Sequence, residues 1–144
     1  MKQILFLVFV AIINITTAKQ YPWTGKRDQS QSVSEMNECM TKSYADAKIY
    51  FENMYNALFK KVKTDLKKAK KATVQFEILS KYNTYLPRLK KSLSDNALCM
   101  SELDAAGSVG GSEYDSIKAE SFLKNMENNI TLLKNIEAEL PSFN

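Results

Sequence analysis

Residues 32–69 read SVSEMNECMTKSYADAKIYFENMYNALFKKVKTDLKKA, and apolar residues recur along them at steps of three, four and seven. These apolar positions are Met36, Met40, Ala47, Phe51, Met54, Leu58, Val62, Leu66 and Ala69. An α-helix has about 3.6 residues per turn, so these side chains fall on one face of a single long helix. Ser32 and Glu35 have the spacing of a capping box, which predicts that the helix begins directly after Ser32.

A second helical segment follows after a short break in this pattern. Thr73 is a suitable N-cap, and the apolar face after it continues through Leu86 to Leu103. Pro87 lies within this segment. Because a proline ring removes a backbone donor and clashes with the preceding turn, Pro87 predicts a kink in the helix or its end.

A loop and a last helix complete the expected layout. Residues 105–112 contain three of the four glycines and predict the loop, and Pro141 ends a helix that starts near Tyr114. The sequence therefore predicts an all-α fold. Its parts are an antiparallel helical hairpin, with a long first arm and a second arm kinked at Pro87, and a C-terminal helix.

The two cysteines are consistent with this hairpin. The midpoint between Cys39 and Cys99 is residue 69, where the first helix is expected to turn into the second. The two side chains would then face each other across an antiparallel pair, and two cysteines in an exported chain most simply form one disulfide. We predict the disulfide Cys39–Cys99, and the alternatives are two free thiols or a bridge to a second chain.

The start of the chain has the pattern of a signal peptide. A short basic start precedes an unbroken apolar run at 4–13, and small and polar residues lead to Ala18. The run is about half as long as a bilayer core requires, and no second apolar run follows. We expect a secreted, extracellular protein without stable membrane insertion. Its parts are a signal peptide (1–18), a flexible N-terminal arm (19–31) and a single helical bundle domain (32–144).

Positive charge is concentrated in one segment. Residues 60–91 hold eleven basic and two acidic residues, a net charge of +9, although the whole chain carries only +4. The candidate residues for binding a heparin-like polyanion or another anionic partner are Lys60, Lys61, Lys63, Lys67, Lys68, Lys70, Lys71, Arg88, Lys90 and Lys91. A dense face of one sign repels itself, and a polyanion relieves that repulsion.

The concentrated positive charge also has an interpretation without a binding partner. The lysines can simply solvate an exposed helix end, and we expect Glu137 and Glu139 to offset part of their charge. The chain contains no motif for reading a nucleic-acid groove, so nucleic acid is not an expected partner.

The chain lacks the residues that most catalytic and metal sites require. The absence of histidine excludes His-based acid–base catalysis and nearly all zinc sites, and two cysteines alone cannot complete a metal ligand set. We therefore expect a non-enzymatic protein with no catalytic residue, metal or cofactor. Asn129, followed by Ile130 and Thr131, is a candidate N-glycosylation site.

Two groups of side chains have both a structural and a functional interpretation. The hairpin is predicted to gather the aromatic residues Tyr50, Phe51, Tyr55, Tyr82 and Tyr85, and to bring Met36, Met40 and Met100 together near the cysteines. We interpret both groups as core. The alternative is a pocket between helices, in which case the protein carries a small apolar ligand.

The chain resembles a group of known secreted proteins in its overall layout. A leader, a short lysine-rich helical body and sparse cysteines are similar to small salivary proteins of blood-feeding flies, nearest the anopheline family that includes anophensin and albicin. Cys39, the segment 85–89 (YLPRL) and Cys99 are the parts that would align first. The resemblance implies a non-enzymatic inhibitor of a host plasma cascade that binds a host plasma protein or protease complex. The cascade would be the alternative complement pathway or contact activation of the kallikrein–kinin system.

Overall fold

The chain forms three long helices, in a computed structural model that describes residues 21, 23, 32–111 and 113–141. They are α2 (Val33–Lys68), α3 (Val74–Ala105) and α4 (Tyr114–Glu139), and a short 3-10 helix, η1 (Ala106–Ser108), follows α3. The prediction of an all-α fold with a helical hairpin and a C-terminal helix is confirmed. The predicted signal peptide, residues 1–18, lies outside the described residues.

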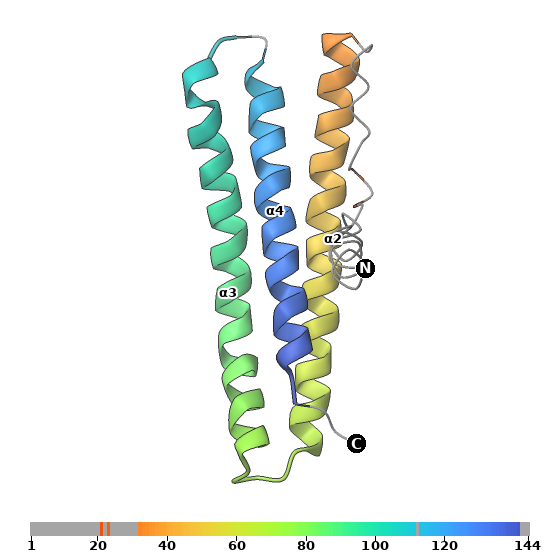
Figure 1. Cartoon of the computed structure of the whole chain (residues 1–144), viewed down its shortest axis with the longest axis vertical. Helices are drawn as coiled ribbons and strands as arrows, with labels where there is room; N and C mark the ends of the chain where they lie inside the picture. The colour runs from red at the N-terminus through yellow and green to blue at the C-terminus, as the bar shows by residue number, and fades with distance from the viewer. Residues whose placement is uncertain (1–20, 22, 24–31, 112, 142–144) are drawn as a thin grey trace, which may run out of the picture.

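The helices alternate in direction, so that α2 and α4 run one way and α3 runs the other (Figure 1). Helix α4 lies between the first two and packs against both along its length. Its buried residues Phe122, Met126, Ile130 and Leu133 meet the apolar stripes of α2 and α3 in one continuous core. Among the described residues, no helix is long and apolar enough to cross a membrane.

The helix ends follow the predicted caps. The Ser32 hydroxyl accepts from the backbone N–H of Glu35, whose carboxylate accepts from the backbone N–H of Ser32, as in a capping box. The Thr73 hydroxyl accepts from the backbone N–H of Phe76 at the start of α3. Pro87, by contrast, does not end its helix, since α3 continues through it. The Pro87 side chain is exposed, and proline has no backbone N–H to bond to the carbonyl group of the preceding turn. Water can therefore reach that carbonyl group.

The predicted disulfide is wrong. Cys39 and Cys99 are not joined and are not within disulfide distance; Cys39 is half-buried on α2, whereas Cys99 is exposed on α3. Cys99 lies two residues from each of the fully buried Ala97 and Ser101, and two residues rotate a helical position by about 200°. The Cys99 side chain therefore leaves α3 on the side away from the core.

The position of α4 explains why the cysteines do not meet. About half-way along the two helices, α2 and α3 touch directly, and the Lys90 ammonium pairs there with Glu52. Toward the cysteines, Phe122 of α4 stacks on Tyr44 of α2, and Phe122 and Met126 line a cleft between α2 and α3. The disulfide requires the two arms to be neighbours at the cysteines, but α4 separates them at that end (Figure 1).

The turn between α2 and α3 contains a strained residue. Ala72 has a φ of 64°, in the left-handed region that costs a side chain with a Cβ atom about 1 kcal/mol. We expect Ala72→Gly to raise the free energy of unfolding by about 0.5–1 kcal/mol in urea denaturation. Ala69→Gly is the control, because Ala69 has an ordinary φ of −67° and glycine there should lower stability. Equal losses in both variants would contradict the expected relief of strain at Ala72.

Candidate functional site

One end of the bundle carries a dense group of lysines, which we call the basic end. It consists of Lys60, Lys61, Lys63, Lys67 and Lys68 on the last turns of α2, and Lys70 and Lys71 in the turn to α3 (lower end in Figure 1). All seven side chains are exposed. They lie opposite the face on which Leu58 and Val62 are buried, so the helix that forms the core also presents these lysines to solvent.

The lysines of the basic end have no acidic partners in the part of the chain that the structure describes. None of the seven forms an ion pair, and the ammonium group of Lys63 instead lies 4.3 Å from the centre of the Phe59 ring. Helix α4 does run back toward this end, as predicted, but Glu137 and Glu139 are exposed and form no ion pair with a described lysine. The expected direct compensation of the basic end is therefore wrong.

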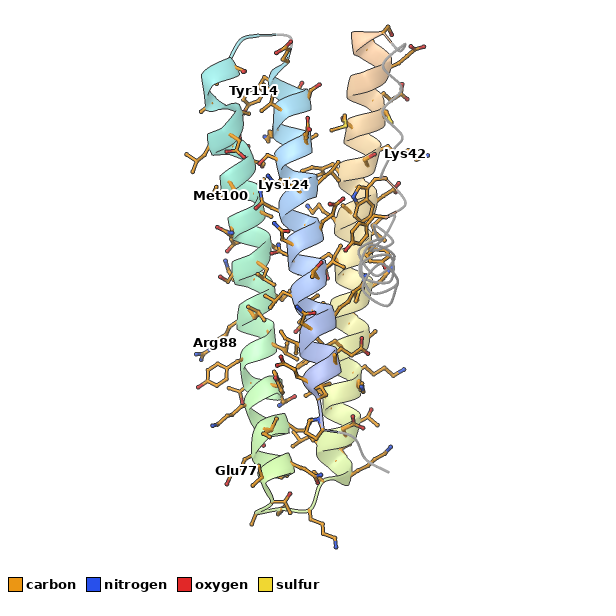
Figure 2. All side chains as sticks on the ribbon, viewed as in Figure 1. Lys42, Glu77, Arg88, Met100, Tyr114 and Lys124 are labelled. Atoms are coloured by element: carbon orange, nitrogen blue, oxygen red, sulfur yellow. The ribbon has the colours of Figure 1, made fainter. Side chains whose placement is uncertain are left out.

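The other predicted basic residues do not belong to this surface. Lys90 pairs with Glu52 and lies 4.8 Å from the centre of the Tyr55 ring, while Lys91 pairs with Asp95 one turn along α3. Arg88 is exposed and points outward from α3, away from the other helices (Figure 2). The candidate site therefore reduces to the seven lysines of the basic end, with Arg88 on a separate face.

The opposite end of the bundle is acidic and internally bonded. The Tyr114 hydroxyl donates to Glu102 over 2.6 Å, and Lys118 forms an ion pair with the same carboxylate. These two hydrogen bonds, with that of Lys118 the stronger influence, hold the pKa of Glu102 below its usual value. The same bond raises the pKa of Tyr114, because Glu102 stabilises its neutral hydroxyl. Glu102 at this end is thus paired, unlike the lysines at the other.

The predicted aromatic cluster is divided between three environments. Phe51 and Tyr55 are core residues, and burial raises the pKa of Tyr55. Tyr50 contacts the N-terminal segment, Tyr82 is half-buried, and Tyr85 is 57% exposed on the outside of α3. The aromatic residues are therefore partly core, as predicted, but they do not surround one pocket.

The cavities give limited support to a ligand carrier. The cleft between α2 and α3 has a volume of about 190 Å³, which is smaller than the roughly 300 Å³ at which small-molecule sites begin. A groove of about 330 Å³ at Tyr82 and Tyr85 reaches that volume, but residues of α3 alone line it, so it is not the predicted pocket between helices. Met40 is buried, whereas Met100 is exposed on the outer side of α3 (Figure 2), so the predicted methionine group does not form between them.

Asn129 is a core residue and not an accessible glycosylation site. Its side chain is 7% exposed, and its amide nitrogen, the atom that would carry a glycan, donates to the Leu93 carbonyl over 3.1 Å. A glycan at this nitrogen would separate α3 from α4. The candidate glycosylation site is therefore wrong for the folded chain, although Asn129-Ile130-Thr131 fits the sequence rule.

Tyr21 and Trp23 contact the bundle, which the sequence pattern does not predict. Trp23 is 6% exposed, its ring stacks on Tyr21 at 5.0 Å, and its edge meets Tyr50 of α2. The indole N–H donates to Glu127 of α4 over 2.9 Å, and Lys134 lies over the Tyr21 ring. Two aromatic residues in an otherwise polar arm were the available signal, because large aromatic side chains are seldom left in solvent.

Comparison of the chain with known protein families, with curated proteins and with solved structures finds no match. Within the described residues, no group of three or more cysteine, aspartate or glutamate side chains is arranged to hold a metal ion. The function is therefore inferred from the charge and geometry of the bundle itself.

Proposed function

We propose that this chain is a secreted, non-enzymatic binding protein and that its basic end binds a linear polyanion of the heparin type. The observation that carries the proposal is the set of seven exposed lysines without ion pairs among the described residues. Neighbouring ammonium groups repel one another, and a polyanion removes this repulsion while releasing its own condensed counterions.

Lysine rather than arginine forms this surface, and that determines the kind of recognition we expect. A lysine ammonium group acts as a flexible point charge, whereas arginine binds phosphate or sulfate through two fixed hydrogen bonds. The basic end contains no arginine. We therefore expect binding that depends on charge density and salt concentration more than on the sequence of sugars.

The inhibition of a host plasma cascade, which the resemblance to salivary proteins implies, remains our proposal for the consequence of this binding. A small rigid protein that covers a polyanion withholds it from other plasma proteins that bind the same polymer. Complement and contact-activation assays with the secreted chain, with and without added heparin, test this proposal. Inhibition that heparin abolishes would support it.

The polyanion site predicts a specific loss of heparin binding. We expect Lys63→Glu/Lys67→Glu/Lys70→Glu to elute from immobilised heparin well below physiological salt, while the unmodified chain is retained. Each lysine that no longer neutralises a group of the polymer should also reduce the slope of log affinity against log salt by about 0.7–0.9. Salt-gradient elution and titration at several salt concentrations measure both effects.

A matched control separates local charge from net charge. Lys42→Glu/Lys48→Glu/Lys124→Glu changes the net charge equally but alters exposed lysines away from the basic end; Figure 2 labels Lys42 and Lys124. This control should keep most of the retention. Equal losses in both triple variants would mean that only net charge matters, and the basic end would not be a site.

A further inference from the structure

Five exposed polar side chains form one row along the outer side of α2. They are Asn53, Asn56, Lys60, Lys63 and Lys67, at alternating steps of three and four residues. Such steps keep the side chains within about one quarter of the helix circumference, and the row lies opposite the buried Phe51, Leu58 and Val62. The row is about 21 Å long, at about 1.5 Å of helix per residue. We call it the polar row of α2.

The polar row extends the basic end toward the middle of α2 (Figure 1). Its three lysines belong to the basic end, and its two asparagines continue the same line beyond them. Residues 49–67 contain two acidic side chains, and neither lies on the row. Glu52 pairs with Lys90 of α3, while Asp65 is half-buried and lies about 200° around the helix from Lys63. A polyanion that follows the row therefore meets no unpaired carboxylate.

The two asparagines make no contribution to the fold that accounts for their positions. The side chains of Asn53 and Asn56 are exposed and form no hydrogen bond with any residue that the structure describes. Asparagine is a poor helix former, because its amide group competes for backbone hydrogen bonds, and alanine or glutamine would favour α2 more. The helix is thus less stable for containing them, and their amide groups are left without an intramolecular partner.

We propose that a sulfated polysaccharide lies along the polar row and that Asn53 and Asn56 bind its uncharged groups. This inference rests on the proposed polyanion binding and adds two residues to the same site. The three lysines neutralise sulfate groups, while the amide groups above them bond to hydroxyl groups of the sugar rings. Because the five side chains form one straight line, the polymer would run parallel to the axis of α2.

The chemistry of the amide group favours a polysaccharide over other linear polyanions. An asparagine amide has two donor hydrogens and an acceptor oxygen, whereas a lysine ammonium group only donates. The oxygens of ionised sulfate and phosphate groups only accept, so a polyphosphate offers nothing to the amide oxygen. A hydroxyl group both donates and accepts, and it can therefore bond to either part of the amide. Any hydroxyl group within reach serves, so the preference is for a class of polymer and not for a sequence of sugars.

Heparin and linear inorganic polyphosphate are the two probes that test this inference. We expect Asn53→Ala/Asn56→Ala to bind heparin about tenfold more weakly, the usual effect of losing one or two hydrogen bonds. Its affinity for polyphosphate should not change, because the lysines that attract that polymer remain. The slope of log affinity against log salt should also not change, since no positive charge is removed. Isothermal titration calorimetry of the secreted chain at several salt concentrations measures all three quantities.

Asn53→Gln/Asn56→Gln is the matched control. Glutamine keeps the amide group and, like alanine, favours a helix more than asparagine does. Both double variants should therefore raise the midpoint of urea denaturation, but only the alanine variant should lose affinity for heparin. Asn128→Ala/Asn135→Ala, which removes two exposed amide groups from α4, should bind heparin like the unmodified chain.

The outcomes separate this inference from the proposed function. Retention lost in Lys63→Glu/Lys67→Glu/Lys70→Glu but full heparin affinity in the alanine variant would leave the basic end as a site and exclude the asparagines from it. Equal losses of affinity for heparin and polyphosphate would overturn the assignment of the row to a polysaccharide. A chain that binds neither polymer at physiological salt would overturn both proposals.

Discussion

Trp23→Ala is expected to lower the free energy of unfolding by about 3 kcal/mol, close to the loss caused by removing a buried aromatic residue from a core. The indole ring is 6% exposed and contacts Tyr21 and Tyr50. The substitution also removes the hydrogen bond from the indole N–H to Glu127. Urea denaturation followed by far-UV circular dichroism measures the change without relying on the fluorescence of this single tryptophan.

Trp23→Phe separates the contribution of ring packing from that of the hydrogen bond to Glu127. Phenylalanine keeps an aromatic ring against Tyr21 but cannot donate to Glu127, so we expect a loss of about 1 kcal/mol from the hydrogen bond and a smaller loss of packing. If Trp23→Ala were as stable as the unmodified chain, the contact between the N-terminal segment and the bundle would contribute nothing to folding.

The helices could be predicted from the sequence because their signals are local. The spacing of Phe51, Leu58 and Val62 identifies the buried face of α2, and all three are in the core. The capping residues Ser32 and Thr73 mark where α2 and α3 begin. Such signals depend on neighbours within a turn or two, so one sequence is sufficient to detect them.

The arrangement of the helices could not be predicted in the same way. Periodicity shows which face of α2 is buried but not whether α3 or α4 covers it. The spacing of Cys39 and Cys99 suits a simple hairpin, yet Phe122 of α4 stacks against α2 at that end. The basic residues illustrate the same limit, because the pairing of Lys90 with Glu52 depends on the register between two helices.

Asn129→Asp is expected to destabilise the bundle by about 3–5 kcal/mol near pH 7, which is the usual cost of an uncompensated charge in a core. The Asn129 side chain is 7% exposed, and its amide nitrogen donates to the Leu93 carbonyl oxygen. An aspartate at this position would place a carboxylate against that oxygen, and a carboxylate has no proton to donate. Urea denaturation at several pH values measures the loss.

The pH dependence of Asn129→Asp distinguishes a buried charge from a simple loss of packing. Burial raises the pKa of the introduced carboxyl group in the folded chain above the value of about 3.9 in the unfolded chain. Below about pH 4 the group is protonated in both states and can donate to Leu93, so most of the lost stability should return. As the pH rises above the pKa of the unfolded chain, only the unfolded state releases its proton, and stability falls until the pKa of the folded chain is passed.

Asn129→Leu, similar in size but uncharged, should lose only about 1 kcal/mol relative to the unmodified chain at every pH. Equal losses for the two variants at neutral pH would mean that water reaches this position and that α3 and α4 are not closely packed around it.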